Sequence, residues 1–223
     1  MKVKYLAATI IIILAACMAT GFTACTGNKG ELPVFSTGDK WVSRWHTGDQ
    51  EYIVTSEITD EEFTEGKDCY VMETTFEPPY MGELTGTVNK YDKATFDIIT
   101  MDFHSVKPDE FTNITYETSG DVFYPLEVGK EITKTETRTI TTGNATVSQT
   151  YEVTATIKTI VEKIEKITVE AGTFQCFKLL KYDEYGVLVQ ITWRSADTKM
   201  FQVKLVDMAE EDAIYELIAY SVK

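Results

Sequence analysis

The sequence predicts an all-β protein built from antiparallel strands. Threonine, valine, isoleucine and aromatic residues, which strands prefer, are abundant after residue 33, whereas helical periodicity is scarce. The 223 residues are 43% hydrophobic and 12% aromatic, which is enough apolar material for a hydrophobic core. One large domain, or two small similar halves, is therefore expected rather than a disordered acidic chain.

The clearest strand runs from residue 133 to residue 141. Threonine occupies every odd position, and the other face carries Lys134, Glu136, Arg138 and Ile140. Neither face is strongly apolar, so the sequence predicts a strand that is exposed to solvent. Gly143-Asn144 then predicts a turn, and residues 150–157 form the returning strand of a hairpin.

Residues 157–169 are predicted to form a further strand. The apolar residues are spaced in patches that also fit a helix, but the many β-branched residues favour a strand. Ala171-Gly172-Thr173-Phe174 predicts the following turn, because glycine adopts backbone conformations that other residues resist. Phe174 is expected to pack its ring under the next strand. Later strands are expected at residues 188–193 and 215–222.

The two halves of the chain resemble each other in the order of their elements. An apolar segment leading to a glycine and a lysine occurs at residues 34–40 and again at 122–130. A glycine, a cysteine and an aromatic strand occur in that order at residues 66–71 and 172–178. Duplication of a β-meander, with halves at residues 34–107 and 122–223, explains this order. Chance similarity among common strand and turn residues explains it equally well.

The N-terminus has the features of an export signal. Lys2 and Lys4 precede an apolar run that includes residues 10–14 and is too short to span a bilayer. The run ends in Leu14-Ala15-Ala16-Cys17, which resembles the lipobox of bacterial lipoproteins. Residues 1–16 are therefore predicted to be a lipoprotein signal peptide, and the Cys17 thiol is predicted to accept diacylglycerol.

Other interpretations of the N-terminus remain open. Residues 22–25 form a second lipobox candidate ending in Cys25, but Phe22 replaces the usual aliphatic residue. An ordinary signal peptide or an uncleaved anchor is a further alternative. The small polar residues of 17–33 predict a flexible linker that leads to a β-rich domain at 34–223.

Charge and the lipid anchor indicate where the domain works. A formal net charge of −14 repels phosphate backbones, so nucleic acid is not expected as a partner. Acyl chains on Cys17 would hold the protein on a membrane. The sequence thus predicts a membrane-anchored, extracytoplasmic protein, on the cell surface or on the periplasmic side, whose partners are the membrane and either envelope proteins or an apolar ligand.

Residues 162–180 resemble a segment common in uncharacterised exported β-domains of prokaryotes, in which a strand ends in Val-x-Ala-Gly-Thr-Phe. Here that motif is residues 169–174, although Glu170 stands where proline is usual. The start Gly-Asp-Lys-Trp-Val at residues 38–42 and the strand around Trp193 are similar too, whereas residues 197–199 replace a turn that usually contains glycine. The resemblance implies a curved antiparallel sheet, either a half-barrel like that of lipoprotein carriers or an open barrel.

Residues with catalytic or metal-binding chemistry are sparse. His46 and His104 are 58 positions apart and lie outside any zinc motif, so no metal or other cofactor is expected. The acidic runs 60–62 and 210–212 lack the ligand spacing of a calcium loop. No serine lies in a nucleophile-elbow motif, and the sequence therefore predicts a protein that is not an enzyme. Cys69 and Cys176 can form a disulfide or remain two buried thiols.

The aromatic residues leave two hypotheses for function. Their side chains could line a concave face that binds an apolar ligand, or they could fill the core. In the first case the domain is a carrier or sensor, with Trp41, Trp45 and Trp193 as candidate ligand contacts. In the second case it is a non-catalytic interaction or scaffold module of the cell envelope, and the sequence favours this function because no sequence feature specifically requires a ligand. The aromatic residues considered are Trp41, Trp45, Tyr80, Tyr91, Tyr116, Phe123, Tyr124 and Trp193.

Overall fold

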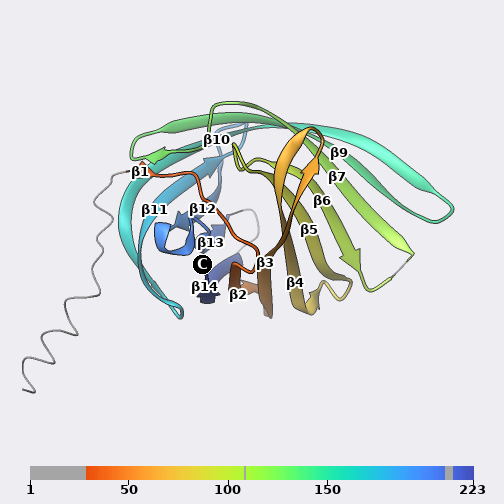
Figure 1. Ribbon diagram of the computed structural model, residues 1–223, viewed down its shortest axis with the longest axis horizontal. Coiled ribbons are helices and arrows are strands. Elements are labelled where there is room, and N and C mark those ends of the chain that lie inside the picture. Colours follow the sequence, from red (N-terminus) through yellow and green to blue (C-terminus); the bar gives the residue numbers. More distant parts are fainter. Residues whose placement is uncertain (1–28, 108, 209–212) are drawn as a thin grey trace, which may run out of the picture.

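Figure 1 shows the computed structural model, which describes residues 29–107, 109–208 and 213–223. The described residues form strands, apart from turns and one 3-10 helix, η1 (Ala196–Thr198). The strands are β1 (Lys29–Gly30), β2 (Lys40–Thr47), β3 (Gln50–Thr64), β4 (Lys67–Tyr80), β5 (Leu84–Asp92), β6 (Ile98–Ser105), β7 (Glu110–Gly120), β8 (Leu126–Glu127), β9 (Glu131–Asn144), β10 (Ser148–Val169), β11 (Gly172–Tyr182), β12 (Leu188–Arg194), β13 (Gln202–Asp207) and β14 (Ala213–Ser221). The prediction of an all-β fold is confirmed.

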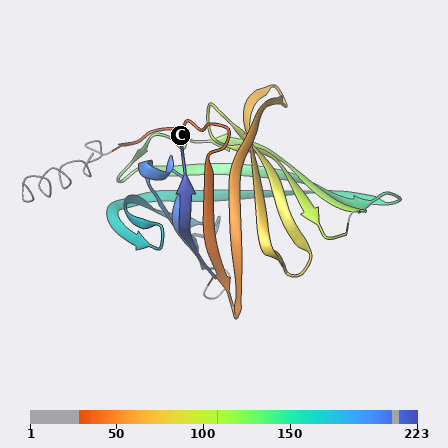
Figure 2. The same ribbon diagram turned by 60° about the horizontal axis from the view of Figure 1, so that its bottom comes forward.

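Twelve of these strands form one antiparallel sheet that closes into a barrel. Consecutive strands pair along most of the chain, and two pairings between distant segments complete the circle. β14 pairs with β2, so the first and last strands of the barrel lie side by side (Figure 2). β7 pairs with β9 past the short strand β8, and β9 pairs with β10. The predicted curved antiparallel sheet is confirmed, and its edges meet.

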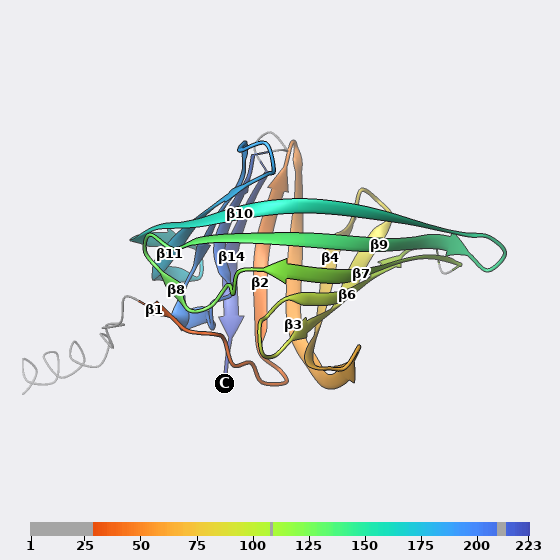
Figure 3. The same ribbon diagram turned by 90° about the horizontal axis from the view of Figure 1, so that it is seen from above.

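The predicted hairpin is also confirmed. Gly143 pairs with Ser148, and the Asn144 side chain accepts hydrogen bonds from the backbone N–H groups of Thr146 and Val147 at 3.0 and 3.1 Å. β10 is a strand over its whole length, not a helix. β9 and β10 extend together beyond the neighbouring strands (Figure 3).

The turn between β10 and β11 agrees with the sequence analysis. Val169 pairs with Gly172, whose φ of 137° favours glycine. Phe174 is 4% exposed and packs in the main core cluster, as its position after the turn predicted. The two cysteines, Cys69 and Cys176, are buried free thiols in the structure.

The segment before β2 crosses one end of the barrel (Figure 1). Within it, Phe35 is 3% exposed and makes edge-to-face contacts with Trp41 and Tyr70 at 5.3 and 5.4 Å between ring centroids. β1 pairs with β8, so residues 29–33, at the end of the predicted linker, belong to the folded part. Gly30 permits this contact, because a Cβ atom there would lie 2.6 Å from the Met200 side chain.

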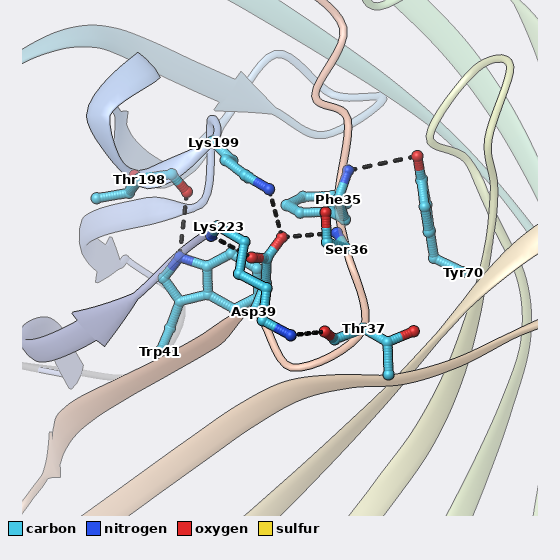
Figure 4. Close-up of polar contacts among 9 residues, drawn as sticks. All are labelled: Phe35, Ser36, Thr37, Asp39, Trp41, Tyr70, Thr198, Lys199 and Lys223. Carbon is cyan, nitrogen blue, oxygen red and sulfur yellow. Dashed lines mark hydrogen bonds and ion pairs between the residues drawn. The ribbon is translucent and has the colours of Figure 1, made fainter.

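A buried carboxylate, that of Asp39, links three segments at this end of the barrel through hydrogen bonds (Figure 4). Asp39 has no exposed surface. Its Oδ2 accepts hydrogen bonds from the Ser36 N–H and the Lys199 ammonium, both at 2.7 Å, and its Oδ1 accepts one from the Lys223 N–H at 2.8 Å. Nearby, the Trp41 indole N–H donates to the Thr198 carbonyl at 3.1 Å. The start of the fold, η1 and the C-terminus are thereby joined, and we call this group the Asp39 cluster.

Candidate functional site: a two-part cavity in the barrel

The barrel contains two adjoining cavities, each partly open to solvent. The wide cavity has a volume of about 550 Å³ and the narrow cavity one of about 320 Å³. Tyr91, Phe96, Gln190 and Arg194 line both of them. The Tyr91 and Phe96 rings stack at 4.8 Å between centroids, and burial raises the pKa of the Tyr91 hydroxyl to about 12. These four side chains therefore form the boundary between two parts of one interior space.

The loop between β5 and β6 contributes Phe96 to this boundary. Phe96 adopts a positive φ of 61°, which is unusual for a residue with a side chain. Its N–H donates to the Asp92 carbonyl at 2.7 Å, and its ring lies 5.2 Å from that of Phe35. Packing against Phe35, in the segment before β2, thus holds a residue with a strained backbone on the wall of both cavities.

Aromatic and aliphatic side chains form much of the wall of the wide cavity. Trp45 stacks on Tyr80 with 4.6 Å between ring centroids, and Tyr52 lies beside both rings. Burial raises the pKa of Tyr215, which lies on the same wall. Six of the apolar lining residues are Trp45, Phe76, Phe103, Phe201, Leu205 and Tyr215.

Short polar side chains occupy another part of that wall. Ser56 on β3 and Thr74 on β4 share a hydrogen bond of 3.0 Å between their hydroxyl oxygens. The Asn89 amide donates to the Thr87 hydroxyl at 3.1 Å on β5. Since these residues are small and bond to one another, they leave volume in the barrel that larger apolar residues would fill.

The narrow cavity is rich in charge. Its wall contains Lys134, Glu136, Lys181 and Arg194, together with Asp97 from the β5–β6 loop. Lys134 forms an ion pair with Asp97, and Glu136 pairs with Arg138 at 2.8 Å. The charged face of β9 thus lines the interior. The prediction of a solvent-exposed strand is wrong for this face, because closure of the sheet places it inside the barrel.

Lys181 is a half-buried cation on this wall. Burial lowers the pKa of its ammonium, while Glu136 and Asp207 act in the opposite direction. Arg138 and Arg194 add to the lowering, because like charges disfavour the protonated form. The net direction is downward, so the surrounding carboxylates do not fully compensate the cost of removing its charge from water.

The three tryptophans predicted as ligand contacts lie in different surroundings. Trp45 lines the wide cavity. Trp41 is fully buried and stacks on Phe201 at 4.4 Å between centroids. Trp193 is 9% exposed, and its indole N–H donates to Glu165 at 2.8 Å. Neither Trp41 nor Trp193 is part of the wall of either cavity.

The remaining predicted aromatic contacts divide between the core and the cavities. Tyr91 and Phe123 line a cavity, whereas Tyr124 is 5% exposed in a core cluster. The Tyr116 hydroxyl lies 3.9 Å from the Met101 sulfur, and Tyr80 packs on Trp45. Cys17 lies outside the described residues, so its lipidation stays a prediction.

The charged lining was missed at the sequence level. Lys181 follows two leucines in a strand that otherwise packs in the core, and Arg194 follows Trp193. A charged residue on the buried face of an apolar strand was the available signal. Its importance depends on which other strands face it, and sequence spacing does not show this.

Other functional chemistry is sparse among the described residues. His46 is 46% exposed and lies 3.5 Å from Glu51, and His104 is exposed. No group of three or more histidine, cysteine or carboxylate side chains could hold a metal ion in the described part of the chain. The acidic run at 210–212 lies outside the described residues. Among residues 29–107, 109–208 and 213–223, no helix is long and apolar enough to cross a membrane.

Comparison with known proteins does not assign a family. No protein family model matches the sequence, and no curated protein is significantly similar to it. A crystal structure of a candidate lipoprotein from Parabacteroides distasonis aligns with 86% of this chain and 99% of its own, at 10% identity and a TM-score of 0.39. A candidate exported protein with a YmcC-like fold from Bacteroides fragilis gives the same coverage, 11% identity and a TM-score of 0.38. Neither structure assigns a role to the barrel.

Proposed function

We propose that the barrel binds an apolar ligand in its interior and acts as a carrier or sensor in the cell envelope. The wide cavity carries this proposal, because it combines a volume of about 550 Å³ with an aromatic and aliphatic wall. Binding sites for small molecules usually have volumes of roughly 300–1,000 Å³ and mostly apolar walls with a few polar groups. The predicted lipid on Cys17 would tether the barrel to an extracytoplasmic membrane face.

The arrangement of the core supports ligand binding. Large side chains fill the end of the barrel that the segment before β2 crosses, where Phe35, Trp41 and Leu217 are almost fully buried. The wide cavity lies beside this core and contains Ser56, Thr74 and Thr87 on its wall instead. Interiors are normally close-packed, so a volume of this size beside a well-packed core is unusual for a purely structural domain.

The aromatic wall contributes part of the free energy of binding. Removing about 200 Å² of ligand apolar surface from water contributes roughly 5 kcal/mol at 25 cal/mol per Å². The entropy lost on association offsets part of this contribution. The apolar contribution alone corresponds to a Kd no tighter than about 0.2 mM, so tighter binding requires polar contacts in addition.

A matched pair of variants tests the proposal. Thr74 lines the wide cavity, whereas its neighbour Thr75 on β4 is exposed. Thr74→Phe places a ring in the cavity, and Thr75→Phe makes the same chemical change on the outer surface. Residues 26–223 contain all described contacts of the barrel, so this fragment is suitable for both variants.

Binding is measured with the neutral fluorescent probe N-phenyl-1-naphthylamine, and folding is checked by thermal unfolding. We expect the unmodified domain and Thr75→Phe to bind the probe, and Thr74→Phe to bind it at least about tenfold more weakly. Native mass spectrometry of the domain, purified without detergent, would reveal a retained apolar molecule. Absence of probe binding by the folded domain would contradict the proposal.

A second candidate function is favoured by the hairpin of β9 and β10. Val147, Tyr151 and Val153 are 63%, 52% and 44% exposed at its outer part. Exposed apolar side chains on a protruding element are typical of protein-binding surfaces. A scaffold or interaction module would then bind an envelope protein through this hairpin. Tyr151→Ser/Val153→Ser should abolish partner capture in envelope extracts in that case and leave probe binding unchanged.

The anchoring part of the proposal has its own test. Cys17→Ser in the full-length protein removes the thiol that would accept the lipid, and Cys25→Ser is the matched control. Incorporation of a radiolabelled fatty acid should be lost only in Cys17→Ser. Loss of labelling in Cys25→Ser instead would place the lipid on the second candidate.

A further inference from the structure

The charge of the cavity wall contrasts with the charge of the whole protein. The chain has a formal net charge of −14. The narrow cavity nevertheless has three cationic side chains on its wall, Lys134, Lys181 and Arg194, against the two carboxylates of Asp97 and Glu136. The carboxylate of Asp207 lies on the wall of the wide cavity, so the positive excess is confined to the narrow cavity, where it favours anions.

Lys181 and Arg194 differ from Lys134 in the groups that surround their charges. Lys134 has a close carboxylate partner in Asp97. Lys181 is half-buried, and Glu136 and Asp207 do not offset the cost of removing its charge from water. Arg194 is held in place because its Nη1 donates to the Met200 carbonyl at 3.1 Å and lies 3.4 Å from the Tyr124 hydroxyl. A guanidinium has five N–H donors, and Nη1 makes both of these contacts.

Arg194 also connects the two cavities. It lines the narrow cavity together with Lys181 and lines the wide cavity together with Phe201 and Leu205. Gln190 on the same strand, β12, also belongs to both walls and pairs with Lys181 on β11. A molecule in the barrel can therefore touch the cations at one end and the aromatic wall at the other.

We propose that the ligand is a single-chain amphiphile whose anionic head group, a carboxylate or a phosphate, binds Lys181 and Arg194 while its apolar chain occupies the wide cavity. This inference rests on the proposed function and specifies the class of ligand. A head group at this position gives a half-buried ammonium an anionic partner, and ion pairs with a pre-positioned guanidinium are among the stronger polar contacts in proteins.

The experiment compares ligands that share a chain and differ in their heads. Dodecanoate, dodecyl phosphate and dodecanol are titrated separately, below their aggregation limits, into the domain of residues 26–223, and Kd is measured by calorimetry. Lys181→Met removes the ammonium and keeps an apolar side chain of similar length. Lys158→Met is the matched control, because Lys158 lies on the adjacent strand β10 with a 42% exposed side chain and pairs with Glu131 at 2.7 Å.

We expect at least one of the two anionic ligands to bind the unmodified domain at least about tenfold more tightly than dodecanol. The tighter of the two then identifies the head group. Lys181→Met should remove this preference and leave the Kd of dodecanol within about threefold, whereas Lys158→Met should retain the preference. The change in the ratio of the two affinities separates a lost charge contact from a general loss of folding.

Other results would overturn the inference. Equal binding of the anionic ligands and dodecanol would reject an anionic head-group site and still support an apolar cavity. A preference that persists in Lys181→Met would place the anion elsewhere. Failure of all three ligands and of the neutral naphthylamine probe to bind would reject the proposed function itself.

Discussion

Removal of the Asp39 carboxylate should destabilise the barrel strongly. Asp39 is fully buried and joins the segment before β2 to Lys199 and to the backbone of Lys223, which is 184 positions away in sequence (Figure 4). In Asp39→Ala, the Lys199 ammonium and the N–H groups of Ser36 and Lys223 all lose their acceptor. The end of the barrel that the segment before β2 crosses would then contain unpaired polar groups.

The size of the effect follows from these contacts. Breaking a buried ion pair by removing one partner typically costs about 3–5 kcal/mol. The Lys199 side chain is 17% exposed, which permits some solvation, so we expect a loss near the lower limit, about 3 kcal/mol. A change of 1 kcal/mol shifts Tm by roughly 2–4 °C in a domain of this size, so Tm should fall by about 6–12 °C.

Thermal unfolding followed by circular dichroism measures the change, with Glu57→Ala as the control. Glu57 pairs with Lys40 at 2.9 Å, but the two side chains are 37% and 45% exposed. An exposed pair contributes at most about 1 kcal/mol, so the control should lower Tm by less than about 4 °C. Equal shifts in Asp39→Ala and Glu57→Ala would refute the reasoning, because the buried cluster would then stabilise no more than a surface pair.

Three further predictions concern the thiols, the cavity and a turn. In the domain of residues 26–223, Cys69 and Cys176 should react with a maleimide only after unfolding and add two labels by mass, because burial raises both thiol pKa values, that of Cys176 to about 12. A disulfide between them, or labelling of the native protein, would contradict this. Lys181→Met should stabilise the ligand-free domain against urea at pH 7, because burial penalises the protonated form of the lysine. This gain should disappear as the pH rises through the lowered pKa of Lys181 towards 10.5, and a pH-independent difference would contradict the prediction. Gly172→Ala should lower the free energy of unfolding by roughly 1–2 kcal/mol, because alanine resists a φ of 137°, and an unchanged urea midpoint would show that the turn relaxes.

The sequence alone determined the strands and many of their turns. Period-two patterns and β-branched residues identified the hairpin of β9 and β10 and kept β10 from being assigned as a helix. Gly172 marked the β10–β11 turn and the burial of Phe174 after it. These features are local, because they depend on the backbone preferences of residues that are neighbours in the chain.

The Asp39 cluster was only partly visible in the sequence. The motif at residues 38–42 was part of the resemblance to exported β-domains. That its aspartate binds Lys199 and the C-terminus depends on η1 and β14, which approach it from more than 150 positions away. Sequence spacing contains no information on such a contact.

The cavity was decided by tertiary structure. Alternation showed that Lys134, Glu136 and Arg138 share a face of β9, but not that this face lies inside the barrel. The side of a strand that faces inward depends on the pairings of β9 with β7 and of β14 with β2, which close the sheet. Closure also places Arg194 on the wall of the wide cavity with Trp45 and Phe103, and on the wall of the narrow cavity with Lys181. Alternation along a strand distinguishes two faces but does not show which of them points inward. Only long-range pairing determines which face the barrel encloses.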